Sequence, residues 1–149
     1  METGTLQKKN TLSFINDKSP IVDIICNDLS DSGFEILFRS QHIEEGIIQL
    51  SALTSLPEVC IIDLDFYDKN VLADLQELHK QYPSIKLIAH SDRDTEKAVK
   101  PLLEMGFAGY LLIGSDRDDF IKAIDGVTNG GRYFSVGVAK IVQEYFGNK

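Results

Sequence analysis

The sequence predicts an α/β domain built around a parallel sheet with helices on both faces. Five short apolar segments alternate along the chain with segments in which apolar residues recur every three or four positions. Each apolar segment runs into a short polar tip, and no repeat or linker interrupts the alternation. Alternating strands and helices join by right-handed crossovers, which place helices on both sides of one sheet.

The first two strand–helix units are predicted in the N-terminal third of the chain. We expect a strand at residues 11–15, then a helix with Ser19 as its N-cap and Pro20 at its first position. Gly33 suits the end of this helix, because glycine tolerates the left-handed conformation common there. The second strand is expected at residues 34–39. Apolar residues at helical spacing predict the second helix: Ile43, Ile47, Leu50 and Leu53.

The middle of the chain predicts two further units. Residues 60–62 are fully apolar, which is typical of a central strand buried on both faces. A third helix is expected to end before Pro83, and a fourth strand to follow at residues 85–89. The fourth helix, at about residues 94–105, contains Pro101. Because proline removes a main-chain hydrogen bond and costs on the order of 3 kcal/mol, we expect a kink or a late start.

The C-terminal third predicts one more unit and an additional helix. A fifth strand is expected at residues 109–113. Ser115 and Asp118 then have the spacing of a capping box at the start of the fifth helix. A last amphipathic segment covers residues 136–146, with Ser135 as its N-cap.

The composition is that of one globular domain. The chain has 149 residues, of which 43% are hydrophobic and 26% charged. We expect a flexible arm at residues 1–10, the domain at 11–130, and a linker or extension helix at 131–149. Cys26 and Cys60 lie on apolar faces without CxxC spacing, which predicts buried free thiols.

The net charge and the hydropathy of the chain argue against nucleic-acid binding and against a membrane protein. The net charge of -8 opposes a phosphate-binding surface, so the chain is not expected to bind nucleic acid directly. No apolar stretch approaches the roughly 20 residues of a membrane span, and no signal-peptide pattern begins the chain. These features predict a cytoplasmic protein with no membrane contact.

Polar side chains end three of the predicted strands. Asn16 and Asp17 follow the first strand, Asp63 the third and Ser91 the fourth, and the carboxyl ends of parallel strands share one rim. Adjacent carboxylates are costly without a cation, and Mg²⁺ suits an oxygen-only site with one or two carboxylates. Asp63 could then attack phosphorus to form an acyl phosphate, with Ser91 as a hydrogen-bond donor.

These residues resemble the receiver domains of two-component response regulators, and the resemblance covers about residues 12–129. It implies a flavodoxin-like (βα)5 three-layer sandwich with a central five-stranded parallel sheet, here followed by an extra C-terminal helix. It assigns the remaining roles as follows: Asp63 as phosphoacceptor, Ser91 as switch hydroxyl, Tyr110 as switch aromatic, and Asn16, Asp17, Asp63 and Asp65 as metal ligands. Residues 106–112 and 130–135 look like receivers that lead into a LuxR-type helix-turn-helix output domain, which this sequence does not contain.

Two departures from the family predict a weakened site. The lysine that the family carries at the end of strand five is Ile113 here, so a phosphoryl group loses its fixed cation. Asn16 replaces one acid of the metal-binding pair, which should weaken Mg²⁺ binding. Asp65 could ligate the ion through its carbonyl or pair with Arg93 across the mouth of the site. We therefore expect slow phosphorylation, or a pseudo-receiver with none.

The resemblance implies a signalling module rather than an enzyme. Its partners would be a histidine kinase or phosphotransfer protein and a second copy bound through helix four, strand five, helix five or the C-terminal helix. DNA would be reached only through an output domain. His90 is interpreted as an ordinary packed or solvated histidine without a role.

Two other functions compete with the receiver interpretation. The alternative is an aspartyl phosphatase of the haloacid dehalogenase kind that uses Asp63 and Asp65. That family begins with its DxD strand, whereas two strand–helix units precede Asp63 here. A flavodoxin-like nucleotide binder is disfavoured, because residues 16–20 do not form a glycine-rich or hydroxyl-rich phosphate loop.

Overall fold

The computed structural model describes residues 10–17 and 19–147. Nearly all of the predicted arm at residues 1–10 therefore lies outside the described residues. One parallel sheet, in the order β2-β1-β3-β4-β5-β6, runs through the described chain. Its strands are β1 (Thr11–Asn16), β2 (Glu35–Ser40), β3 (Val59–Asp63), β4 (Lys86–Ser91), β5 (Gly109–Leu112) and β6 (Tyr133–Phe134).

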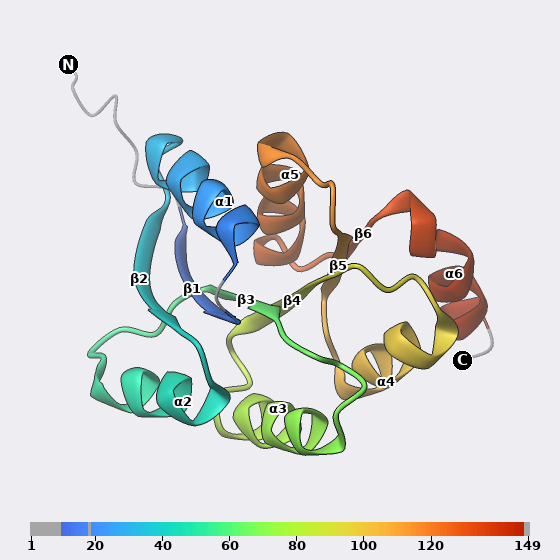
Figure 1. Cartoon of the computed structure of the whole chain (residues 1–149), viewed down its shortest axis with the longest axis horizontal. Coiled ribbons are helices and arrows are strands. Elements are labelled where there is room, and N and C mark those ends of the chain that lie inside the picture. Colours follow the sequence, from blue (N-terminus) through green and yellow to red (C-terminus); the bar gives the residue numbers. More distant parts are fainter. Residues whose placement is uncertain (1–9, 18, 148–149) are drawn as a thin grey trace.

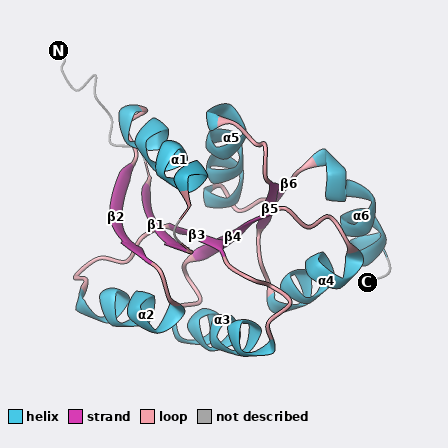
Figure 2. Ribbon diagram, in the orientation of Figure 1, coloured by secondary structure: helices cyan, strands magenta, loops and turns pink. Residues whose placement is uncertain are grey.

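Helices cover both faces of this sheet (Figure 1). The helices are α1 (Pro20–Asp31), α2 (Ile43–Ala52), α3 (Lys69–Gln81), α4 (Glu96–Met105), α5 (Arg117–Thr128) and α6 (Ala139–Gly147), with the 3-10 turn η1 (Val136–Val138). Figure 2 shows α1 and α5 on one face and α2, α3 and α4 on the other, with α6 beside α4. The predicted α/β three-layer sandwich is confirmed.

The core has two layers because strand side chains alternate between the faces. In β3, Ile61 packs with Phe120 of α5 in one buried cluster, whereas Ile62 packs with Leu75 of α3 in the other. All four of these side chains are at most 1% exposed. The central strands are thus hydrophobic on both faces, as the apolar run in the sequence predicts.

The sheet has one strand more than predicted. Tyr133 and Phe134, which lie in the predicted linker, pair in parallel with Gly109 and Tyr110 of β5. The Oγ atom of Ser135 then accepts a hydrogen bond from the N–H of Leu112 at 2.9 Å, and its side chain makes no cap bond. The open edge of β5 supplies main-chain partners to the segment after α5, so Ser135 continues the sheet contact rather than capping a helix.

The capping box of α5 lies one residue later than predicted. Asp116 and Asp119 form it, with reciprocal 2.9 Å bonds between each carboxylate and the other residue's N–H. The hydroxyl of Ser115 instead donates to the carbonyl of Leu112 at 2.7 Å, which closes the turn after β5. The hydrogen bond from the Asp119 N–H lowers the pKa of Asp116.

Helix α4 begins two residues after its approximate expected start, but Pro101 does not set that start. It begins at Glu96, after Thr95 accepts a hydrogen bond from the N–H of Ala98 at 3.3 Å. Pro101 remains inside the helix, which ends at Gly106 in the left-handed conformation, with φ of 105°. Four buried apolar residues hold the helix against the sheet despite the missing main-chain bond: Ala98, Val99, Leu102 and Leu103.

The two cysteines are buried free thiols, as predicted. Burial raises the pKa of Cys26 to about 11 and that of Cys60 to about 12, so both stay protonated at neutral pH. Among the helices of residues 10–17 and 19–147, none combines the length and apolar character needed to cross a membrane.

Candidate functional site

Strand β3 delivers Asp63 to the carboxyl edge of the sheet. It pairs with β1 on one side and β4 on the other, and its first four residues are buried. Asp63 ends the strand with its side chain 25% exposed. An interior strand that ends on a partly accessible carboxylate is the arrangement on which the sequence interpretation depends.

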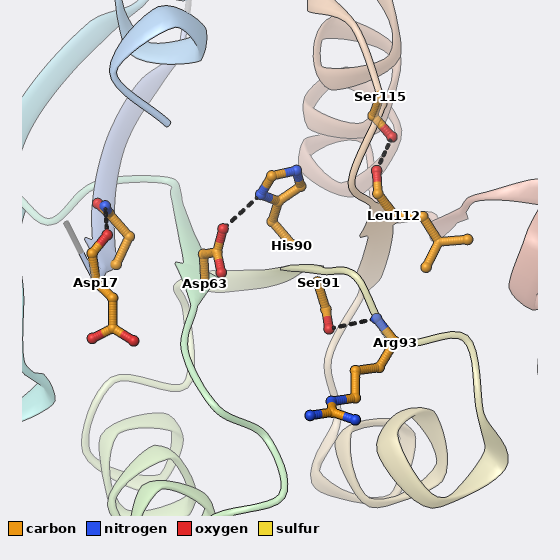
Figure 3. A network of polar contacts seen from close by, with 8 residues as sticks. Asp17, Asp63, His90, Ser91, Arg93, Leu112 and Ser115 are labelled. Carbon is orange, nitrogen blue, oxygen red and sulfur yellow. Dashed lines mark hydrogen bonds and ion pairs between the residues drawn. The ribbon is translucent and has the colours of Figure 1, made fainter. Parts of the chain in front are cut away.

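The polar ends of β1, β3 and β4 converge, as predicted (Figure 3). Asn16 is in register with Asp63, and the N–H of Asp17 donates to the carbonyl of Asp63 at 3.2 Å. Asp17, Asp63 and Ser91 line one cavity of about 220 Å³. The cavity is completed by Leu64, Asp65, Phe66, Tyr67, Asp92 and Arg93.

Asn16 does not join this cavity. Its side chain is 3% exposed, and its Nδ2 donates to the main-chain oxygen of Asp17 at 2.6 Å. It lines a separate depression together with Asp23 and Arg39. The amide of Asn16 therefore stabilises the turn after β1, and the acidic side chain that β1 offers to the cavity is Asp17.

Asp65 lies at the rim in a tight turn. Its carboxylate accepts a hydrogen bond from the N–H of Tyr67 at 3.0 Å, and its carbonyl accepts from the N–H of Asp68 at 3.1 Å. The guanidinium of Arg93 stacks over the ring of Tyr67, 4.3 Å from its centroid. Within the described residues, no ion pair joins Arg93 to Asp65, because cation–π contact with Tyr67 holds the guanidinium.

Ser91 of β4 and Tyr110 of β5 both bind the loop that follows β4. Ser91 is 6% exposed, and its Oγ accepts a hydrogen bond from the N–H of Arg93 at 3.1 Å. Tyr110 is 1% exposed, and its hydroxyl donates to the carbonyl of Arg93 at 2.6 Å. Burial raises the pKa of Tyr110, against the opposing effect of its hydrogen bond with Ser91. The phenol therefore stays protonated and fastens the β4–α4 loop to the core.

Replacing Tyr110 with phenylalanine should lower the free energy of unfolding by about 1 kcal/mol, because it removes one hydrogen bond and keeps the buried ring. Urea unfolding of both proteins measures this difference. Amide hydrogen exchange should also quicken in the loop around Arg93, which loses its attachment. Equal stability with unchanged exchange would show that the phenol does not hold this loop.

His90 is the residue of this site that the sequence interpretation missed. Its Nδ1 lies 2.8 Å from Oδ2 of Asp63, its side chain is 1% exposed, and its ring centroid lies 5.2 Å from that of Phe120. Nothing in the sequence alone marks this contact, because it depends on the register of β4 against β3. Ala89 is the β4 partner of Ile62, so His90 is the next residue in register and stands beside Asp63.

Ile113 leaves the end of β5 without a cation. Its N–H donates to the carbonyl of Ser91 at 2.9 Å, and 42% of its side chain is exposed. Among the described residues, the cavity nevertheless has one cationic residue in its lining, Arg93, which comes from the β4–α4 loop. The positive charge that would balance a phosphoryl group at this site would thus come from Arg93 in the β4–α4 loop rather than from a residue at the end of β5.

The donors around the cavity fit a hard divalent cation. No group of three or more His, Cys, Asp or Glu residues in the described part of the chain is arranged to hold a metal ion. Asp17 and Asp63 nevertheless offer two carboxylates to one solvent-accessible cavity. Mg²⁺ commonly uses one or two carboxylates and completes its shell with water.

Comparison with known proteins agrees with this geometry. No family model matches the chain. The transcriptional regulatory protein DegU of Brevibacillus brevis is 32% identical over 90 residues, which are 60% of this chain and 38% of DegU. The response regulator GacA of Pseudomonas protegens is 27% identical over 72% of this chain and 50% of GacA. The chain thus spans half or less of the length of these curated relatives.

The structural comparison gives the same fold. The isolated REC domain of RcsB from Salmonella enterica serovar Typhimurium matches 91% of this chain and 99% of its own, with a TM-score of 0.78 and 15% identity. The chain therefore has the fold of a response-regulator receiver domain, and the curated proteins that it resembles in sequence are response regulators.

The same fold occurs in a LuxR-type regulator of known structure. A LuxR-family response regulator from Aurantimonas sp. SI85-9A1 matches 94% of the receiver and 99% of its own chain, with a TM-score of 0.77 and 17% identity. Receiver domains are generally signalling modules rather than enzymes, and they generally bind Mg²⁺ at an acidic site.

Proposed function

We propose that the receiver accepts a phosphoryl group on Asp63 in a Mg²⁺-dependent reaction. The single observation that carries this proposal is the convergence of Asp17, Asp63 and Ser91 on one cavity. Phosphoryl transfer to an aspartate requires an oxygen nucleophile, a second carboxylate and a hydroxyl. The missing lysine at Ile113 makes slow and incomplete phosphorylation the expected behaviour.

Each residue has a distinct part in this reaction. A carboxylate oxygen of Asp63 attacks phosphorus, and the hydroxyl of Ser91 donates to an oxygen of the transferred group. Asp17 and Asp63 would hold the Mg²⁺, which when bound neutralises charge on the phosphoryl oxygens. Ser91 and Tyr110 both contact Arg93, so a shift of Ser91 toward the phosphoryl group would reach the β4–α4 loop. We infer that Tyr110 and this loop transmit the change.

The proposed partners follow from the relatives. The phosphoryl donor would be a histidine kinase or a phosphotransfer protein, and the receiver would act in the cytoplasm. One RcsB structure is described as two dimers bound to two parallel DNAs. We propose that this receiver, residues 11–130, likewise pairs with a second copy, and that residues 131–149 extend toward any output domain. DNA would be bound through that output domain.

The aspartyl phosphatase alternative is less well supported. It requires Asp65 to move a proton at the reacting group, but the Asp65 carboxylate accepts the N–H of Tyr67 in a turn at the rim. The phosphatase also requires a fixed lysine, whereas among residues 10–17 and 19–147 the cationic residue in the cavity lining is Arg93, stacked on Tyr67. Accumulation of a phosphorylated protein without turnover of phosphomonoesters would distinguish the receiver.

Incubating the protein with acetyl phosphate and Mg²⁺ should add one phosphoryl group, detected by intact mass. The Asp63→Asn protein should show no adduct, because an amide oxygen is a poor nucleophile. Removing Mg²⁺ with EDTA should also abolish the adduct. Ser91→Ala is the matched control, since it keeps Asp63 and should lower the yield without eliminating it. An adduct that persists in Asp63→Asn, or none in the folded wild-type protein, would contradict the proposal.

A further inference from the structure

The contact between His90 and Asp63 places a buried histidine on the proposed phosphoacceptor. Figure 3 shows the His90 ring extending from the end of β4 toward the Asp63 carboxylate, on the side away from Ser91 and Arg93. The two atoms in contact, Nδ1 and Oδ2, are 2.8 Å apart. The cavity lining includes Asp63 and Ser91 but not His90. His90 therefore approaches the carboxylate from behind the cavity.

The surroundings of the ring indicate which nitrogen carries the proton. Nε2 of His90 is buried and has no hydrogen-bond partner, and the ring packs edge-on against Phe120. A proton on Nε2 would leave a buried N–H unsatisfied, which is unfavourable. A proton on Nδ1 donates to a carboxylate. The neutral ring with Nδ1–H is therefore the form that satisfies every buried polar hydrogen.

We propose that His90 is a positioning residue that holds Oδ2 of Asp63 and thereby favours the unphosphorylated carboxylate. This inference rests on the proposed phosphorylation of Asp63. With Oδ2 engaged by His90 from behind, Oδ1 is the oxygen left to face the cavity. The hydrogen bond from Nδ1–H is charge-assisted while Asp63 is a carboxylate, and it weakens once the carboxyl becomes part of an acyl phosphate.

The transfer step balances without a proton from His90. A lone pair of Oδ1 forms the new bond to phosphorus, while the bond from phosphorus to the donor's leaving group breaks, and that group departs with the electron pair. In hydrolysis, the oxygen of water bonds to phosphorus and the bond from phosphorus to Oδ1 breaks. Its electron pair returns to Asp63 as the carboxylate charge, and the protons of the water leave with the released inorganic phosphate. Nδ1–H stabilises the returning carboxylate, so His90 accelerates loss of the phosphoryl group and keeps its own proton throughout.

The surrounding charges fit this assignment. With Ile113 at the end of β5, that strand brings no ammonium to Asp63, and the cavity cation Arg93 is stacked on Tyr67. The hydrogen bond from His90 is thus the one side-chain contact to the Asp63 carboxylate in the described part of the chain. In the unphosphorylated receiver, this hydrogen bond from His90 holds the Asp63 carboxylate in place.

Two variants at this position separate the hydrogen bond from packing. His90→Phe keeps a flat ring against Phe120 and removes the donor. His90→Asn retains a side-chain N–H at the same distance along the side chain as Nδ1. The proteins are phosphorylated with acetyl phosphate, the reagent is removed, and the decay of the adduct is followed. The adduct on His90→Phe should persist about tenfold longer than on the wild type, because the variant lacks the hydrogen bond that stabilises the returning carboxylate. Hydrogen bonds to ionised acceptors are about twice as strong as those to neutral ones. His90→Asn should decay close to the wild-type rate.

A second measurement on the wild-type protein does not require phosphorylation. The ¹⁵N chemical shifts of His90 should report Nδ1–H at neutral pH, and this preference should be lost in Asp63→Ala. Wild-type protein with Nε2–H instead would overturn the inference whether or not Asp63 is phosphorylated.

The outcomes separate the two proposals. A wild-type adduct whose lifetime is unchanged in His90→Phe overturns the role of His90 and leaves phosphorylation of Asp63 in place. An adduct on His90→Phe alone supports the role of His90, because the histidine then holds Asp63 in its free form. Failure of all three proteins to form an adduct, with folding confirmed by circular dichroism, overturns the proposed function and the inference that rests on it.

Discussion

Ile113→Lys should raise the initial rate of phosphorylation by acetyl phosphate by on the order of 10- to 100-fold, because it supplies a cation where charge develops. Ile113 follows β5 directly, and its N–H bonds to the carbonyl of Ser91 at 2.9 Å. A lysine at this position would thus start from the rim of the cavity that holds Asp63. Since 42% of the Ile113 side chain is exposed, the substitution removes little buried apolar area.

The controls for this prediction isolate the charge. Ile113→Gln adds a polar side chain of similar reach without a cation and should phosphorylate at nearly the wild-type rate. Adding Ile113→Lys to Asp63→Asn should give no adduct, which shows that the new lysine is not itself modified. A rate unchanged by lysine would mean that Arg93 already compensates the phosphoryl charge, and that the departure at Ile113 is not what limits this receiver.

Ile61→Ala should lower the free energy of unfolding by about 2–5 kcal/mol, through lost burial and the cavity left behind. Ile61 is 1% exposed in β3, between Phe14 of β1 and Ile88 of β4. Strands on both sides and α1 and α5 above prevent the site from collapsing into the vacated space. Chemical denaturation of both proteins, with the slope checked for two-state behaviour, measures the loss.

The matched control is Ile48→Ala in α2. Ile48 is 67% exposed, so the same change of side chain should alter the unfolding free energy by less than about 0.5 kcal/mol. Similar losses at the two positions would contradict the assignment of β3 as the buried centre of the sheet. Such a result would also undermine the placement of Asp63, which depends on that strand.

Local pattern was sufficient for the first five strands and the six α-helices, but not for β6. The apolar run at residues 60–62 predicts an interior strand, and β3 is one, because consecutive side chains point to opposite faces and are all buried only where helices cover both faces of the sheet. Asp17, Asp63 and Ser91 could be placed together for a similar reason. Parallel strands present their carboxyl ends at one edge, so a polar residue that ends each strand must reach the same rim.

The side-chain contacts within the site could not be predicted in this way. Asn16 is adjacent to Asp17 in sequence, but its amide turns to the main chain of Asp17 and away from the cavity. The contact of His90 with Asp63 follows from the register of β3 and β4, which the sequence does not specify. Ser135 has the sequence context of a helix cap, yet its oxygen accepts the N–H of Leu112.

The sequence by itself determined the order of strands and helices and the polar residues at the strand ends, because hydrophobic periodicity and chain direction are local properties. Only the tertiary structure decided which side chains touch Asp63. Hydrogen-bond partners depend on the register between strands, on side-chain rotamers and on what fills the space behind the site, and residues distant in sequence set all three. Asp63 and His90, which are 27 positions apart, are the clearest case.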